Sequence, residues 1–203
     1  MKMAMNAVDT SLYPLPVTQK KRIPGDELIW LFLLGDMVCF AMFFALYSYT
    51  KSQHNALFVE AQQALNLHTG SLNTLLLLAS SWFVVIAVKA ARLQMATTCR
   101  WFLLPAVLCG SGFVAIKLFE YQEKAALGIN FLTNDFYLFY YLITGMHFVH
   151  VLLGLPLLVY FAVVIRDGKL DSKTVNNLES SAIFWHMVDL LWIVIFPLIY
   201  LVR

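Results

Sequence analysis

The stretch SAIFWHMVDLLWIVIFPLIYLVR, residues 181–203, decides the fold. Nearly every residue in it is apolar, and a helix of about 20 residues crosses the ~30 Å hydrocarbon core of a bilayer. Backbone groups in lipid have no water to bond with, so the segment is expected to be helical. It nevertheless carries His186 and Asp189, and an ionisable group within a span costs at least ~2.5–3.5 kcal/mol. These two side chains therefore need partners inside the protein.

The whole chain has the composition of a membrane protein. Of its 203 residues, 61% are hydrophobic and 13% are charged, which is too little charge to cover a soluble domain. The net charge of +2, with no basic stripe and no Gly-rich phosphate loop, excludes nucleic acid as a partner. Five apolar segments reach spanning length, at roughly 28–50, 71–91, 101–121, 136–165 and 180–202.

We therefore expect an all-α integral membrane bundle of five transmembrane helices. Residues 28–203 should form its single domain, preceded by a polar cytoplasmic tail over residues 1–27. Ser180 or Ser181 is the expected cap of the last helix.

The distribution of basic residues predicts the orientation. Ten Lys and Arg residues fall on one side of the predicted spans: Lys2, Lys20, Lys21, Arg22, Lys89, Arg92, Arg100, Arg166, Lys169 and Lys173. The opposite side holds Lys51, Lys124 and Arg203, with Lys117 near it. Because basic residues stay on the cytoplasmic side, the N-terminus should lie inside and the C-terminus outside.

The ionisable residues within the spans are the candidate functional groups. They are Asp36, Lys117, Glu120, His147, His150, His186 and Asp189. The pairs His147 with His150 and His186 with Asp189 are each spaced i to i+3, so each pair shares one helix face. We expect His186 and Asp189 to hydrogen-bond the 180–202 helix to the 136–165 helix.

Lys117 and Glu120 are also spaced i to i+3, near the predicted outer boundary. We expect them to form a pair, with the Lys117 side chain extending toward the interface.

Several functions compete for these residues. Two imidazoles on facing helices could ligate a haem, and His147, His150, His186 and Asp189 together could bind a metal, although no H-E-x-x-H spacing supports it. Asp36 is the best candidate for a carboxyl that handles protons. A transporter or channel is a further alternative, but paired Gly/Pro breaks at matching positions are missing from the sequence. The simplest alternative is that the polar groups only hold helices together.

Five motifs, in order along the chain, resemble one family. They are LLGDMVCFAMFFALY (33–47), LNTLLLLASS (72–81), FEYQEK (119–124), TGMHFVHVLLG (144–154) and FWHMVDLLWIVIFPLIYL (184–201). The last two resemble the patterns T-G-x-H-x-x-H-V-x-x-G and W-H-x-x-D-x-x-W of subunit III of the haem–copper terminal oxidases. That family comprises subunits of cytochrome c oxidases and ubiquinol oxidases. The chain resembles its five-span bacterial form, which lacks the first two helices of the seven-span members.

The resemblance implies a function that spacing alone does not. It implies a non-catalytic accessory subunit of the bacterial inner membrane, which packs on catalytic subunit I and other subunits, contacts membrane lipids and supports proton uptake and stability of the complex. Haem and copper are then expected on the partner subunits and no cofactor on this chain, apart from bound phospholipid. Asp36 falls on the family's carbodiimide-reactive carboxylate, which is Glu in many members. His147, His150, His186 and Asp189, beside Trp185, fall on its polar cluster, and Glu120 on the acid ending its third helix here.

The sequence also resembles the branch of the family associated with nitric oxide reductase in denitrifying bacteria, through RIPGDELIWLFLLGDM (22–37) and ESSAIFWHMVDLLWIVIFPLIYL (179–201). That alternative changes the partner and leaves the fold unaltered.

Overall fold

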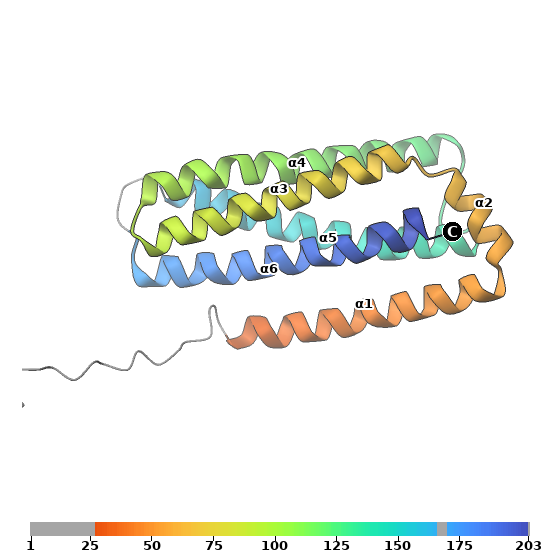
Figure 1. Cartoon of the computed structure of the whole chain (residues 1–203), viewed down its shortest axis with the longest axis horizontal. Coiled ribbons are helices and arrows are strands. Elements are labelled where there is room, and N and C mark those ends of the chain that lie inside the picture. The colour runs from red at the N-terminus through yellow and green to blue at the C-terminus, as the bar shows by residue number, and fades with distance from the viewer. Residues whose placement is uncertain (1–26, 166–169, 203) are drawn as a thin grey trace, which may run out of the picture.

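The computed structural model describes residues 27–165 and 170–202, which form a helical bundle (Figure 1). Its elements, in chain order, are α1 (Glu27–Gln53), α2 (Asn55–Gln63), α3 (Leu67–Arg92), α4 (Ala96–Ala126), α5 (Asp135–Val164), α6 (Ser172–Phe196) and a π-helical turn (Pro197–Leu201). Five helices are long and apolar enough to cross a membrane. The predicted all-α, five-span fold is therefore confirmed. The predicted tail, apart from its last residue, lies outside the described residues, as do Arg166, Lys169 and Arg203.

The five long helices alternate in direction along one axis (Figure 1). Helices α3, α4, α5 and α6 pack against one another, and α1 lies along one side of them, where it contacts α5 and α6. The short helix α2 crosses the end of the bundle at which α1 ends and α3 begins. The start of α1 and the end of the π-helical turn consequently lie at opposite ends of the bundle. Which end faces the cytoplasm stays a prediction from the basic residues.

Polar side chains cap three of the helices. Asn66 accepts from the backbone N–H groups of His68 and Thr69 at 3.0 and 3.3 Å, which satisfies donors that have no partner within α3. Asn134 caps α5 in the same way, at 2.9 Å from the N–H of Tyr137. These side chains fix where two of the spans begin.

The start of α6 differs from the prediction. Asp171 caps the helix by accepting from the N–H of Thr174 at 2.8 Å, and this hydrogen bond lowers the pKa of the Asp171 carboxyl below its ordinary value. Ser180 and Ser181 lie within the helix, and the Ser181 hydroxyl donates to the carbonyl of Asn177 at 3.0 Å. The predicted cap at these serines is wrong because a stronger capping residue stands further upstream, in a polar segment that continues the same helix.

Helix α2 closes the end of the bundle, and the sequence analysis did not predict it. Its Phe58 is fully buried, and the amide of Gln62 donates to the Tyr47 hydroxyl at 3.2 Å and to the Ile199 carbonyl at 3.0 Å. Gln62 therefore joins α2 to α1 and to the π-helical turn. A nine-residue helix is too short to register as a span, which is why hydropathy did not reveal it.

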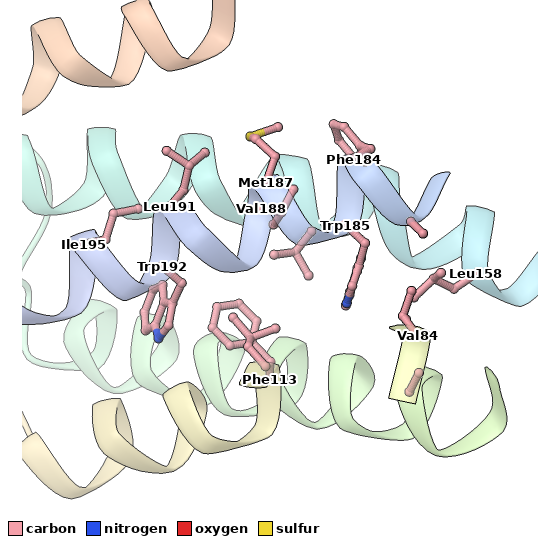
Figure 2. Close-up of a cluster of buried hydrophobic side chains, with 14 of the residues drawn as sticks. Val84, Phe113, Leu158, Phe184, Trp185, Met187, Val188, Leu191, Trp192 and Ile195 are labelled. Carbon is pink, nitrogen blue, oxygen red and sulfur yellow. The ribbon is translucent and has the colours of Figure 1, made fainter. Parts of the chain in front are cut away.

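The core lies between α6 and the facing helices (Figure 2). Trp185 and Trp192 point from α6 toward α3 and α4, whereas Phe184, Met187 and Leu191 point to the other side of α6. Both tryptophans are fully buried. Dispersion contacts and hydrogen bonds hold such an interior together in lipid, where the hydrophobic effect does not distinguish core from surroundings.

Two glycines make room for Trp185. A methyl group at Gly154 in α5 would come within 2.8 Å of the indole, and one at Gly110 in α4 within 3.0 Å. The indole Nε1 donates to the Ser80 hydroxyl in α3 at 3.1 Å. One side chain of α6 thus contacts all three of the other bundle helices.

Candidate functional site

Asp36 is held by a histidine of another span. Its Oδ1 lies 3.1 Å from Nε2 of His150, and the side chains of these residues are 11% and 8% exposed. Asp36 comes from α1 and His150 from α5, so this contact joins the outlying helix to the bundle. Phe40 packs edge-on against the imidazole, with ring centroids 5.8 Å apart.

The hydrogen bonds of His150 show what its contact with Asp36 requires. Its Nδ1 lies 2.8 Å from the Met146 carbonyl oxygen, which can only accept, so Nδ1 carries a hydrogen and donates. A neutral imidazole carries one N–H, which leaves Nε2 bare. The contact with Asp36 therefore needs one further hydrogen, carried by the carboxyl or by the imidazole. A hydrogen bond across this contact would therefore place one proton between α1 and α5.

Asp36 also borders the surface of the bundle. It lines a shallow hollow of about 480 Å³ on α1, together with Leu28, Leu31, Phe32, Gly35 and Cys39. Its second oxygen, Oδ2, is buried and has no hydrogen-bond partner among the described residues. The carboxyl thus lies between an imidazole on one side and an apolar surface hollow on the other.

A second charged cluster lies near the end of the bundle that α2 covers. Nζ of Lys117 is 3.2 Å from Oε2 of Glu120, and it also donates to the hydroxyls of Tyr140 and Tyr200, at 3.3 Å each. The same two hydroxyls donate to the other carboxylate oxygen, Oε1, at 2.7 and 2.6 Å. All three ammonium hydrogens and both carboxylate oxygens of the pair are therefore used. The groups come from α4, α5 and the π-helical turn, which they fasten together.

The predicted pairing of Lys117 with Glu120 has this geometry, but the expected extension of Lys117 toward the interface is wrong. Its side chain is 0% exposed. Nζ lies 4.9 to 5.9 Å from the centroids of four aromatic rings, those of Tyr121, Tyr140, Trp192 and Tyr200. Ring faces attract a cation, and together with the carboxylate they replace the water that the ammonium group would otherwise seek.

His186 has a different partner from the one predicted. Its Nδ1 lies 2.6 Å from the Ser81 hydroxyl in α3, so it links α6 to α3 and not to α5. Ser81 also lies close to Asp189, but both carboxyl oxygens of Asp189 have no hydrogen-bond partner among the described residues. The predicted hydrogen bonds from His186 and Asp189 to the 136–165 helix are therefore wrong. The physical reason is that this face of α6 packs on α3.

The three membrane histidines point toward different helices. His147 is fully buried between the rings of Phe113 and Trp192, at centroid distances of 5.7 and 5.2 Å. His150 faces α1, and His186 faces α3. Within residues 27–165 and 170–202, no three His, Cys, Asp or Glu side chains converge in a way that could hold a metal ion. The predicted polar cluster is thus divided over separate helix contacts.

Sequence reasoning missed the neutral partners at these sites. Ser81, Tyr140 and Tyr200 each complete a hydrogen bond to an ionisable group. The only sequence signal was that Tyr200 lies within FWHMVDLLWIVIFPLIYL and Ser81 within LNTLLLLASS, two of the motifs that resemble the family. Hydroxyl groups carry no charge, so a search for ionisable residues passes over them.

The comparison with known families decides the identity of this chain. The sequence profile of the family Cytochrome c oxidase subunit III matches residues 26–202. The chain belongs to the cytochrome c oxidase subunit III family. As a member, it is an accessory subunit of a haem–copper oxidase complex and a multi-pass protein of the bacterial inner membrane.

Individual subunit III relatives cover most of both sequences. The cytochrome bo(3) ubiquinol oxidase subunit 3 of Buchnera aphidicola subsp. Acyrthosiphon pisum is 28% identical over 91% of this chain and 88% of its own. The cytochrome c oxidase subunit 3 of Bacillus sp. strain PS3 is 31% identical over 85% and 83%. That of Thermostichus vulcanus is 28% identical over 84% and 83%. The chain is thus similar to subunit III proteins named for ubiquinol oxidases and for cytochrome c oxidases.

Proposed function

We propose that this subunit III packs on the catalytic subunit of its oxidase, supports proton uptake there, and keeps the complex working over many turnovers. In this proposal the partner subunits carry the haem and copper and pass electrons from cytochrome c or quinol to oxygen. The present chain carries out no catalysis itself and contributes protein surface, bound phospholipid and a carboxyl group.

The observation that supports this role is the 3.1 Å contact between Oδ1 of Asp36 and Nε2 of His150, which one shared proton would make a hydrogen bond. With one proton between them the acid and the imidazole are together neutral, so the pair can be buried beside an apolar surface hollow, and release of that proton leaves one negative charge until another proton is taken up. Such a group is suited to holding a proton near the uptake path of a neighbouring subunit. Helix packing alone does not require a buried acid with an imidazole partner, because apolar residues of similar volume stabilise a helix contact as well or better.

The test is Asp36→Asn in the assembled oxidase. The amide keeps the shape of the side chain but cannot release a proton, so we expect slower proton uptake and a shorter working lifetime during sustained turnover. Asp36→Glu, which restores a carboxyl, should recover most of both properties. Glu179→Gln, which removes a carboxylate paired with Arg92 at the bundle surface, is the matched control and should change neither. Unchanged uptake and lifetime in Asp36→Asn would leave Asp36 a packing residue.

The association with nitric oxide reductase stays a prediction from the sequence. The relatives described above are named for oxidases, which favours the oxidase partner. Affinity purification of the tagged chain from mild detergent, with identification of the large subunit that accompanies it, separates the two. A catalytic subunit of a nitric oxide reductase in place of an oxidase subunit I would overturn the proposal.

A further inference from the structure

Three buried side chains in the middle of the bundle have unused polar atoms. Both side-chain polar atoms of Asn73, His147 and Asp189 are without a hydrogen-bond partner among the described residues. These residues are 0%, 0% and 3% exposed. Buried polar groups in proteins almost always have partners, so Asn73 and His147 call for a ligand, and so does Asp189, which otherwise has only the nearby Ser81 hydroxyl.

Contacts around Trp192 link the parts of the helices that carry the three residues. His147 of α5 contacts Phe113 of α4 and Trp192 of α6, and those two rings contact each other at a centroid distance of 4.9 Å. The Trp192 indole donates to Thr74 of α3 at 3.0 Å, and Thr74 is the neighbour of Asn73. Asp189 precedes Trp192 by three residues, on the same face of α6.

We infer that this level of the bundle, between α3, α4, α5 and α6, is a binding site for ordered water molecules. Water suits the set of groups because an amide, an imidazole and a carboxyl each need both donors and acceptors, and one molecule supplies two of each. The residues do not suit a metal ion, since only His147 and Asp189 among them are good ligands for one. Nζ of Lys117 lies 5.5 Å from the centroid of the Trp192 ring, and His186 lies three residues before Asp189 on α6, so bound water would extend toward both of these polar groups. This inference rests on the bundle geometry and is independent of the proposed role of Asp36.

Hydroxyl-radical footprinting of the assembled oxidase in lipid nanodiscs tests the site. X-ray pulses convert water into radicals where it is bound, and mass spectrometry identifies the side chains that are modified. Phe113 lies at the proposed site and is fully buried, so bulk water cannot reach it. Phe136 is the matched control, because it is equally buried but packs among the rings of Phe58, Tyr137 and Tyr140. We expect Phe113 to be modified several-fold faster than Phe136.

A variant of Asn73 tests whether the modification of Phe113 depends on the buried polar groups. Asn73→Leu replaces the amide by an apolar side chain of similar size and should reduce the modification rate of Phe113 toward that of Phe136. Retention of the subunit in the purified complex shows that the variant folds. Equal rates for Phe113 and Phe136 in the native complex would overturn the inference, and this comparison decides the matter even where Asn73→Leu does not assemble. An unchanged Phe113 rate in an assembled Asn73→Leu complex would also overturn it.

Discussion

Nζ of Lys117 and Oε2 of Glu120 lie 3.2 Å apart inside the bundle, with side chains that are 0% and 5% exposed. Two tyrosine hydroxyls bridge both partners. Desolvation of two charges is costly, and the hydrogen bonds offset that cost only while the set is complete. The arrangement therefore stabilises the bundle as a unit. Removal of one member should weaken the contacts among α4, α5 and the π-helical turn.

Glu120→Leu should strongly destabilise the subunit because it leaves the Lys117 ammonium buried without a counter-charge. Loss of one partner of a buried pair costs about 3–5 kcal/mol. The double change Lys117→Met with Glu120→Leu should cost clearly less than Glu120→Leu alone. The measurement is the temperature at which this subunit leaves the purified complex. Equal losses for the single and double variants would mean that the charges are not coupled.

Glu179→Gln is the surface counterpart of that experiment. Glu179 accepts from Nε of Arg92 at 2.7 Å, but the Arg92 side chain is 54% exposed. Surface ion pairs contribute about 0–1 kcal/mol, so the dissociation temperature should barely change. A shift as large as that of Glu120→Leu would show that the α3–α6 end of the bundle is more strongly coupled than its exposure suggests.

Gly154→Ala should destabilise the packing of α5 on α6. The added methyl group would lie 2.8 Å from the Trp185 ring, which also lies close to Gly110 of α4. Overpacking of this kind costs typically about 1–3 kcal/mol. Gly145→Ala, on the same helix with open space at the added atom, is the control and should have little effect. The same dissociation assay applies, and equal behaviour of the two variants would contradict the close packing of Trp185.

His150→Leu should change the reactivity of Asp36. Without the imidazole, the carboxyl has no partner to share its proton and will stay protonated in its apolar setting. Carbodiimides react with protonated carboxyl groups, so labelling of Asp36 by dicyclohexylcarbodiimide should become faster. Peptide mass spectrometry measures the rate, with Asp36→Asn as the unlabelled control. Slower labelling in His150→Leu would indicate that the imidazole keeps the carboxyl protonated and does not share its proton.

The sequence was sufficient to predict the transmembrane helices but not the hydrogen-bond partners of the ionisable residues within them. Hydropathy located five helices because each must carry about 20 apolar residues whatever its neighbours are. The bounds were less well determined at polar ends, as at α6, which begins at Ser172 because Asp171 caps it. Periodicity placed His186 and Asp189 on one helix face but could not say which helix lies opposite that face. The predicted partner helix of His186 was therefore wrong, and the contact between Asp36 and His150 was not predicted.

The buried position of Lys117 was unpredictable for a related reason. A lysine near the end of an apolar segment can extend to the interface at little cost, and this is the usual outcome. Only the fold brings Tyr140 and Tyr200, from two other elements, to the same point. A charged residue is kept inside by groups that are distant in sequence, and single-segment reasoning does not reveal them.

The π-helical turn at Pro197–Leu201 has a consequence for how the chain is assembled. Side chains from α1 and α2 hydrogen-bond to the backbone of this turn and of the residue after it. Tyr47 donates to the Leu198 carbonyl at 3.3 Å and Gln62 to the Ile199 carbonyl at 3.0 Å. Lys51 donates to the Val202 carbonyl. The π-helical turn, which follows the fifth span, is thus held by residues that precede the second span. These hydrogen bonds can form only after all five spans have been synthesised, so they close the bundle late in folding. Removal of the residues from Pro197 onward should leave insertion of the spans intact and loosen the packing of α2 and of the end of α1.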